Sequence, residues 1–331
     1  MRRTTGRCPS AHLFAALAGL LAVLVAAPPA AAAPTPAPAA DAGFTWAVQP
    51  SGKDGPTGRS YFVYDAAPGQ RIDDRVAVTN LGTQPMTFAV YGSDAYTTAD
   101  GSFALQPASH RAADVGAWTS FGARAYQVAA GKRVVIPFQL TVPANASPGD
   151  HAGGIVASVV QAQAGGGGRV NLDRRVAARI YLRVAGAVRP AVQVEAMKIG
   201  YENPLNPVGT APVVVMYRVR NTGNVRVAGS GHVQIQAPFG WKLAGTEPAR
   251  LPELLPGSAI TITEQVNGIV PAGRLGIRVT VEASTADSKL PAVTRSAGQW
   301  AVPWLWVALL AVVAVVLVAR RVRTLRRRRA G

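Results

Sequence analysis

The chain has 331 residues, 49% of them hydrophobic, and a formal net charge of +17 at pH 7. At about 100 to 200 residues per domain, this length allows one to three domains. The single cysteine, Cys8, leaves the rest of the chain without a disulfide, a thiolate metal ligand or a cysteine nucleophile. Three arginines near the N-terminus and seven near the C-terminus, with no acidic residue among them, leave +7 for the middle of the chain, so we expect no nucleic-acid partner.

The first 33 residues have the three-part pattern of a secretory signal peptide. Arg2, Arg3 and Arg7 precede an apolar run from Leu13 to Ala27, and small residues follow that run. We therefore expect residues 1–33 to be a signal peptide and the protein to be exported. The following residues, 34–43, are rich in proline and alanine, which predicts an extended spacer.

The composition changes at Phe44, where short runs of Val, Ile, Thr and aromatic residues begin to alternate with turn residues. In residues 174–184, apolar side chains alternate with arginines, as in a strand that buries one face. The glycines from Gly165 to Gly168 predict the loop of a long hairpin. These patterns are typical of an all-β protein.

A weak internal repeat predicts two domains of the same kind. Residues 75–91 resemble residues 217–233, because each segment has a strand, an Asn-x-Gly turn and a second strand. We therefore expect two consecutive immunoglobulin-like β-sandwich domains, at 44–188 and 189–288, followed by one C-terminal transmembrane helix. Residues 93–127 form an insertion in the first domain.

The stretch SPGDHAGGIVASVV, residues 147–160, places turn residues and a histidine before an apolar run. It predicts a sharp structural turn between two strands. Glycine pairs at such places allow a bulge or a close approach of another backbone, and a lone histidine beside a turn is interpreted as structural rather than as a ligand. The predicted turn residues are Pro148, Gly149, Asp150, His151, Gly153 and Gly154.

The C-terminal part predicts a membrane anchor. Residues 289–299 are expected to be a linker, and 300–319 a transmembrane helix, because Ala301 to Ala319 carry no charge. The arginine-rich tail, 320–331, is expected in the cytoplasm. This predicts a single-pass plasma-membrane protein whose N-terminal domains face the cell-wall space. Leu290 to Thr294 resembles a sortase signal but departs from its spacing, so we expect the helix to be retained.

Several motifs of the first domain resemble the peptidoglycan-binding domain of the WxL-interacting proteins in their actinobacterial form. They occur in the same order within about residues 44–187 and are FTWAVQPS, GRSYFVYDAAPGQRIDDRVAVTNLG, YGSDAYTTADGSF, DVGAWTSF and PGDHAGGIVAS. The resemblance implies an immunoglobulin-like fold, surface display and contact with the cell wall. Residues 190–288 look like a generic immunoglobulin-like domain.

The residues that carry most chemistry do not form a catalytic pattern. The histidines outside the signal peptide are widely separated, and no HExxH motif is present. The acids near residues 65–74 lie around turns, although two carboxylates remain open as a glycosidase pair. Residues 94–102 offer oxygen ligands without the spacing of a calcium loop. We expect no enzymatic activity, no cofactor and no bound metal.

For glycan binding, the candidates are aromatic side chains near loops, with arginines that pair with carboxylates. Trp46 is expected in the core. A row of arginines on one strand face either follows an anionic polymer or protects an edge strand from aggregation. The candidate contacts with a glycan or a partner are Tyr96, Trp118, Arg175, Arg179 and Arg183.

Our hypothesis from the sequence is a non-enzymatic surface protein whose first domain binds peptidoglycan, an anionic wall polymer or another secreted surface protein. The C-terminal helix makes the membrane itself a partner. Two alternatives stay open. One is a structural accessory that assembles surface proteins or fibres through β-edge pairing. The other is an accessory module of carbohydrate-active enzymes.

Overall fold

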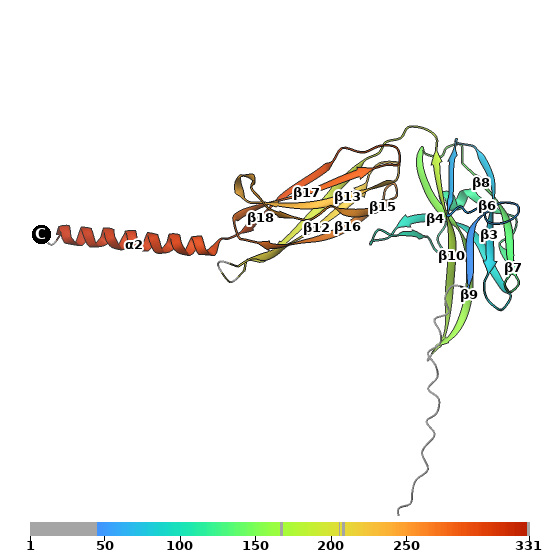
Figure 1. Ribbon diagram of the computed structural model, residues 1–331, viewed down its shortest axis with the longest axis horizontal. Helices are drawn as coiled ribbons and strands as arrows, with labels where there is room; N and C mark the ends of the chain where they lie inside the picture. The colour runs from blue at the N-terminus through green and yellow to red at the C-terminus, as the bar shows by residue number, and fades with distance from the viewer. Residues whose placement is uncertain (1–44, 166–167, 205, 207–208, 330–331) are drawn as a thin grey trace, which may run out of the picture. The chain divides into compact units, whose positions relative to one another are not determined.

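The computed structural model describes residues 45–329 except 166–167, 205 and 207–208. The predicted signal peptide, the spacer and the middle of the glycine loop lie outside the described residues. The described chain forms two consecutive immunoglobulin-like β-sandwiches and one C-terminal helix (Figure 1). The predicted fold class is therefore confirmed.

The first sandwich pairs two sheets of mostly antiparallel strands. Its elements are β1 (Trp46–Ser51), β2 (Phe62–Ala66), β3 (Arg71–Asn80), β4 (Met86–Thr97), β5 (Phe103–Leu105), α1 (Val115–Trp118), β6 (Thr119–Phe121), β7 (Ala125–Val128), β8 (Arg133–Thr141), β9 (Gly149–Gly165) and β10 (Gly168–Val184). One sheet has the order β1-β3-β8-β6 and the other β2-β10-β9-β4, with β5 and β7 also paired to β4. Only β2 and β10 run parallel within these sheets.

The two sheets bury one apolar face each. Alternation along β10 places Ala178, Ile180 and Leu182 in the core while arginines occupy the other face. Trp46 is buried in the same core, and its indole N–H donates to the carbonyl of Ala157 at 3.2 Å. Its role is structural, as the sequence predicts.

The second sandwich repeats this plan with fewer additions. Its elements are β11 (Val192–Tyr201), β12 (Ala211–Asn221), β13 (Val227–Gln236), η1 (Pro238–Gly240), β14 (Lys242–Gly245), β15 (Ala249–Leu254), β16 (Ala259–Ile269), β17 (Gly273–Ser284) and β18 (Val293–Ala301). The sheets have the orders β11-β12-β16 and β14-β13-β17-β18, and β15 also pairs with β13. The core of this sandwich is separate from the first, and the chain passes between the cores after Val184 and before Val192.

The Asn-x-Gly repeat has the same hydrogen bonds in both sandwiches. Asn80 is fully buried, accepts the N–H of Gly82, and donates to the carbonyls of Gln84 and Val128 at 2.8 and 3.0 Å. Asn221 makes the equivalent bonds, and its acceptors are the carbonyls of Val225 and Leu254, at 2.7 and 3.0 Å. In each sandwich one amide therefore joins a turn to a neighbouring strand.

The predicted linker at 289–299 is wrong. Most of it belongs to β18, which pairs with β17 from Val293↔Val281 to Ala301↔Gly273. The segment shows no clear alternation of apolar and polar residues, because only its C-terminal end is buried. Its strand conformation is stabilised by pairing with β17.

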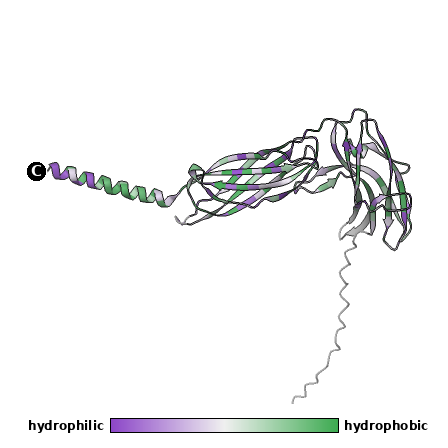
Figure 2. Cartoon of the chain, turned by 45° about the horizontal axis from the view of Figure 1, so that its top comes forward, coloured by the Kyte–Doolittle hydropathy of each residue, from purple (hydrophilic) through white to green (hydrophobic). Residues whose placement is uncertain are grey.

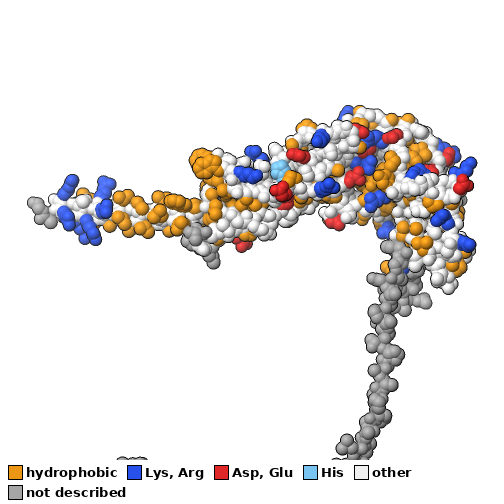
Figure 3. Space-filling model, in the orientation of Figure 1, with side chains coloured by type: hydrophobic (Ala, Val, Ile, Leu, Met, Phe, Trp, Pro, Cys, Tyr) orange, Lys and Arg blue, Asp and Glu red, His pale blue; other side chains and the backbone are white. Residues whose placement is uncertain are grey.

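The C-terminal helix α2 spans Trp304–Arg329, so it begins four residues later and extends further than the predicted span of 300–319. It is long and apolar enough to cross a membrane, and none of its apolar window is buried against the rest of the protein. Figure 2 shows the change from apolar to polar residues along α2, and Figure 3 shows the basic side chains near its C-terminal end.

Candidate functional site

The β9–β10 hairpin is longer than the strands that flank it. β9 and β10 pair from Gly149↔Val184 to Gly165↔Gly168 without a register shift. β4 pairs only with residues 153–158 of β9, and β2 only with residues 180–184 of β10. Within the described residues, β10 therefore has no second strand beside residues 168–179. We call this segment the free edge of β10.

A groove lies over the outer face of the same strand, between β10 and the insertion. Its volume is about 540 Å³, which is within the range of roughly 300–1,000 Å³ for ligand pockets. We call it the β5–β10 groove. Its lining residues are Tyr96, Phe103, Ala104, Leu105, Val156, Asp173, Arg174, Arg175, Ala177 and Arg179.

The groove brings together three of the five predicted contact residues. Tyr96 is 39% exposed. The guanidinium carbon of Arg179 lies 4.6 Å from the ring centroid of Phe103, and no carboxylate of the described chain lies within ion-pair distance of it. Arg175 is placed by Asp173 at 3.6 Å. The groove therefore presents cations beside aromatic rings, which suits a ligand that carries a carboxylate.

Gly153 and Gly154 let the insertion approach both faces of β9. A Cβ on Gly153 would lie 2.7 Å from the carbonyl oxygen of Ser93 and 2.8 Å from Val115 of α1. A Cβ on Gly154 would lie 2.7 Å from Leu105 of β5. Successive residues of a strand face opposite sides, so this pair serves α1 on one face and β5 on the other. No bulge interrupts the register there.

Asp94 holds the insertion in place. Its carboxylate accepts the backbone N–H groups of Ala113, Asp114 and Gly116 at 2.7, 3.1 and 2.7 Å. The Ser93 hydroxyl donates to the carbonyl of Gln106 at 2.8 Å. These bonds place β5 above the outer face of β10, and the Asp94 carboxylate that we considered for calcium binds backbone N–H groups instead.

The predicted turn at residues 148–154 is shorter in the structure. Only Pro148 forms the bend, and β9 already begins at Gly149, whose φ is +122°. Asp150, His151, Gly153 and Gly154 are strand residues. Pro148, Gly149 and Asp150 are residue types typical of turns, but Asp150 and His151 fit into the strand because each side chain has a partner from another element.

Asp150 is the buried centre of an ion-pair network between the sandwiches. Its carboxylate accepts from Arg183 at 2.7 and 3.2 Å and from the backbone N–H of Arg226 at 2.8 Å. Burial raises the pKa of Asp150, but these hydrogen bonds and both arginine charges outweigh burial, so its pKa is lowered. Arg183 also pairs with Asp287 at 2.7 Å. This arginine therefore joins the two sandwiches and lies outside the β5–β10 groove.

His151 and Trp118 form a second packed cluster away from the groove. Both ring nitrogens of His151 face acceptors, with Nδ1 2.7 Å from Asp114 and Nε2 2.8 Å from the carbonyl of Ser147. Burial lowers the pKa of His151, but these bonds raise it more, and the net shift is upward. The Trp118 ring centroid lies 4.8 Å from that of His151, against the core. Trp118 is therefore not brought together with Tyr96.

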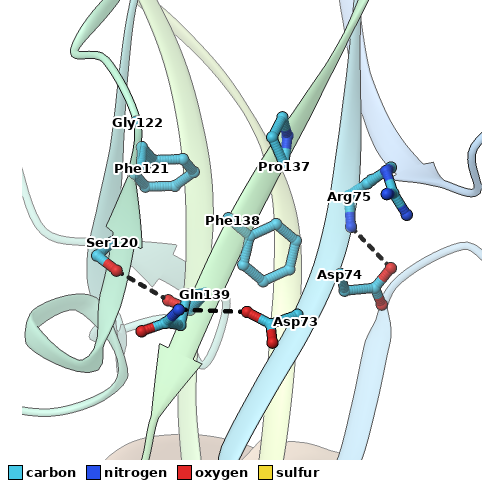
Figure 4. Close-up of a pocket in the computed structure, with 9 residues that line it drawn as sticks. All are labelled: Asp73, Asp74, Arg75, Ser120, Phe121, Gly122, Pro137, Phe138 and Gln139. Atoms are coloured by element: carbon cyan, nitrogen blue, oxygen red, sulfur yellow. Dashed lines mark hydrogen bonds between the residues drawn. The ribbon is translucent and has the colours of Figure 1, made fainter.

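A smaller pocket of about 310 Å³ lies over β3, β6 and β8 (Figure 4). Its carboxylates already have partners, because Asp74 pairs with Arg59 at 3.0 Å and accepts from Tyr64, and Asp73 accepts from Gln139. Burial raises the pKa of Asp74, but the bonds from Arg59 and Tyr64 lower it more. In the described chain, no group of three or more His, Cys, Asp or Glu side chains is placed to hold a metal ion.

No family model matches the chain, and no curated protein matches it. The chain is similar to solved structures of fimbrial chaperones. A chaperone–tip adhesin complex of CFA/I fimbriae is 11% identical, with 78% of this chain and 99% of that chain covered and a TM-score of 0.38. The SafB chaperone, solved with the SafA pilin of Salmonella enterica, is 12% identical, with 77% and 97% covered and a TM-score of 0.32.

The CupB2 chaperone of Pseudomonas aeruginosa is 10% identical, with 74% of this chain and 99% of that chain covered and a TM-score of 0.30. At these values, the similarity concerns β-sandwich architecture and assigns neither a family nor a partner. Membership of the WxL-interacting family stays a prediction.

Proposed function

We propose that this protein is a non-enzymatic, membrane-anchored binding protein that captures a partner protein by β-strand addition at the free edge of β10. The observation that carries the proposal is the register of β10, which pairs with β9 over seventeen residues and with β2 over only five. The unpaired N–H and C=O groups of such an edge are donors and acceptors for an added strand.

Two features support this edge as a docking site. Natural edge strands use proline residues and β-bulges to prevent unwanted pairing. β10 contains no proline and has no register shift against β9. Leu172 on this segment is 42% exposed and offers an apolar contact to an incoming strand. α2 would hold the sandwiches at the membrane, with the arginine-rich end in the cytoplasm.

Photo-crosslinking along the edge tests the proposal. A photo-reactive residue is placed at each of positions 172 to 177 in the full chain in its native membrane, with position 193 on β11 as the matched edge of the second sandwich. We expect one partner band from several β10 positions and none from position 193. A band from position 193 alone would contradict the proposal.

Proline substitution makes this test specific for strand pairing. Backbone N–H groups alternate in direction along a strand, so of Leu172→Pro and Asp173→Pro one removes an outward donor and the other disrupts the β9 ladder. We expect the outward-facing variant to lose the crosslinked band while its unfolding midpoint stays near that of the unsubstituted protein. A band that survives both variants would exclude main-chain pairing.

A second candidate function is binding of a carboxylated wall glycan or anionic wall polymer in the β5–β10 groove. The observation that favours it is Arg179, which lies against Phe103 with no carboxylate partner in the described chain and shares the groove with Tyr96. Such a site would recognise a sugar face by stacking and a carboxylate by charge.

Sedimentation of the detergent-solubilised full chain with purified peptidoglycan, at low and moderate salt, tests this candidate. Tyr96→Ala and Arg179→Ala are each expected to weaken saturable binding about tenfold, which corresponds to about 1.4 kcal/mol. Arg218→Ala removes the same charge from the second sandwich and is expected to have no effect. Equal weakening by both arginine variants would mean only general charge attraction.

A further inference from the structure

One end of the second sandwich carries exposed aromatic rings beside the start of α2. η1 follows β13 and packs against β17, and Gln236 of β13 pairs with Gly276 of β17. Three residues earlier, Gly273 of β17 pairs with Ala301, the last residue of β18. The η1 segment and the end of β18 therefore lie at the same end of one sheet.

The tether between this sheet and α2 is short. Ala301 is fully buried, and α2 begins at Trp304, three residues later. Three extended residues span at most about 11 Å. The first turn of α2 must therefore lie close to this end of the sheet, in whatever direction the helix leaves it.

The η1 segment and the residue that follows it display two aromatic side chains to solvent. Phe239 is 95% exposed and Trp241 is 72% exposed, and their ring centroids are 6.4 Å apart. Phe239 has φ +67°, and within the described chain it is the only residue other than glycine with a positive φ. A bulky side chain in this conformation costs free energy. Backbone strain of this kind clusters at functional sites such as ligand clamps, so an exposed, strained aromatic residue is a candidate for a binding contact.

The neighbouring charges match a lipid headgroup layer. Lys242 follows Trp241 directly and is exposed, and Arg274 lies across the β17–β18 ladder from Trp300, which is itself 68% exposed. Aromatic rings with an apolar body settle at the boundary between headgroups and acyl chains, and lysine and arginine beside them attract anionic lipids.

We propose that Phe239 and Trp241, which we name the aromatic loop, form a second membrane contact that inserts into the outer headgroup boundary of the bilayer spanned by α2. This inference goes beyond partner capture and rests on the membrane-anchoring part of the proposed function. The loop and α2 together would hold the second sandwich against the membrane and limit its rotation about the short tether.

Site-specific fluorescence quenching tests the aromatic loop. The full chain with Cys8→Ser is reconstituted in nanodiscs that contain phosphatidylglycerol, with a bimane label on Phe239→Cys, Val316→Cys or Ser288→Cys. Val316 lies within α2, and Ser288 is an exposed residue at the other end of the second sandwich. All three side chains are exposed, so the substitutions leave the core intact.

We expect acyl-brominated lipids to quench the labels at 239 and 316 at least twofold and the label at 288 not at all. Aqueous iodide should quench mainly the label at 288. Quenching at 316 but not at 239 would overturn the aromatic-loop proposal alone. A label at 239 shielded from iodide but insensitive to brominated lipid would overturn it in favour of a covering protein. No lipid quenching at 316 would overturn the membrane span and the loop together.

Discussion

The two sandwiches share a hydrogen-bonded Asn-x-Gly turn and differ in the segments that are added to the common framework. In both, a fully buried asparagine joins an Asn-x-Gly turn to the end of a neighbouring strand through three hydrogen bonds. Only the first sandwich has the insertion at 93–127 and the long β9–β10 hairpin. The framework is therefore repeated, while the groove and the free edge arise from two additions to one copy.

The strongest test of the shared framework is to remove each asparagine. Asn80→Ala and Asn221→Ala should each reduce the free energy of unfolding by about 3 kcal/mol, because three bonds at about 1 kcal/mol each are lost and buried partners stay unpaired. Urea denaturation measures the loss, and hydrogen exchange should place it in the substituted sandwich. If the two variants lose amounts of unfolding free energy that differ by more than about twofold, the two Asn-x-Gly turns are not equivalent.

The contact between the sandwiches gives the next largest effect. Asp150→Ala leaves Arg183 and Arg226 without their buried carboxylate and should cost about 2–3 kcal/mol, below the roughly 3–5 kcal/mol of a fully buried broken pair because both arginines are partly exposed. Asp73→Ala, in an exposed pair with Arg71, is the control and should cost under about 1 kcal/mol.

The stabilising contribution of the Asp150 carboxylate should decrease at acidic pH. The folded pKa of Asp150 is lowered, so its contribution is present above the unfolded value of about 3.9 and is lost as pH falls through the folded value. The stability difference between the unsubstituted protein and Asp150→Ala should therefore shrink on acidification below about pH 4. A constant difference down to pH 2 would exclude this titration.

Substitution of Gly153 and Gly154 tests how closely the insertion approaches β9. Gly153→Ala and Gly154→Ala should each cost about 1–3 kcal/mol, because the added methyl overlaps Ser93 and Val115 in one case and Leu105 and the carbonyl of Ala178 in the other. The matched control is Gly200→Ala in the second sandwich, where a Cβ meets only ordinary contacts at 3.9 Å. Thermal denaturation of the three variants measures the difference, and equal losses would refute the close approach.

The smallest expected effect concerns His151. Its folded pKa is raised, so its contribution is fully present below the unfolded value of about 6.5 and is lost as pH rises through the folded value. His151→Gln should therefore cost under about 1 kcal/mol at pH 5.5 and less at pH 9. Imidazole NMR titration of His151 checks the direction, and a folded pKa below the ordinary histidine value of about 6.5 would contradict it.

Local sequence patterns contained much of the framework. Alternation in residues 174–184 predicts which face of β10 is buried, and the repeated Asn-x-Gly turn predicts two related domains. The Gly153–Gly154 pair predicts either a bulge or a close approach of another backbone, and the structure shows no bulge there but a close approach on each face. These features depend on neighbouring residues, which is why they can be recognised without the fold.

Other features depend on partners that are distant in the chain. The sequence predicts a linker where β18 lies because β18 is stabilised by its pairing with β17. It predicts a turn at residues 150–154 because the partners of Asp150 and His151 lie in other elements. The candidate contact residues also lie in different places. Tyr96, Arg175 and Arg179 line one groove, whereas Trp118 packs against His151 and Arg183 pairs with Asp287.

The all-β class, the repeat and the apolar C-terminal helix can be predicted from the sequence, because strand alternation, turn residues and an uncharged run are local properties. Three features emerge only from tertiary packing: β2 covers only five residues of the outer edge of β10, the insertion folds over the outer face of β10, and the aromatic loop lies beside the start of α2. Each of these features depends on how strands that are distant in the sequence align with one another. That alignment is a property of two segments together, so neither segment specifies it alone.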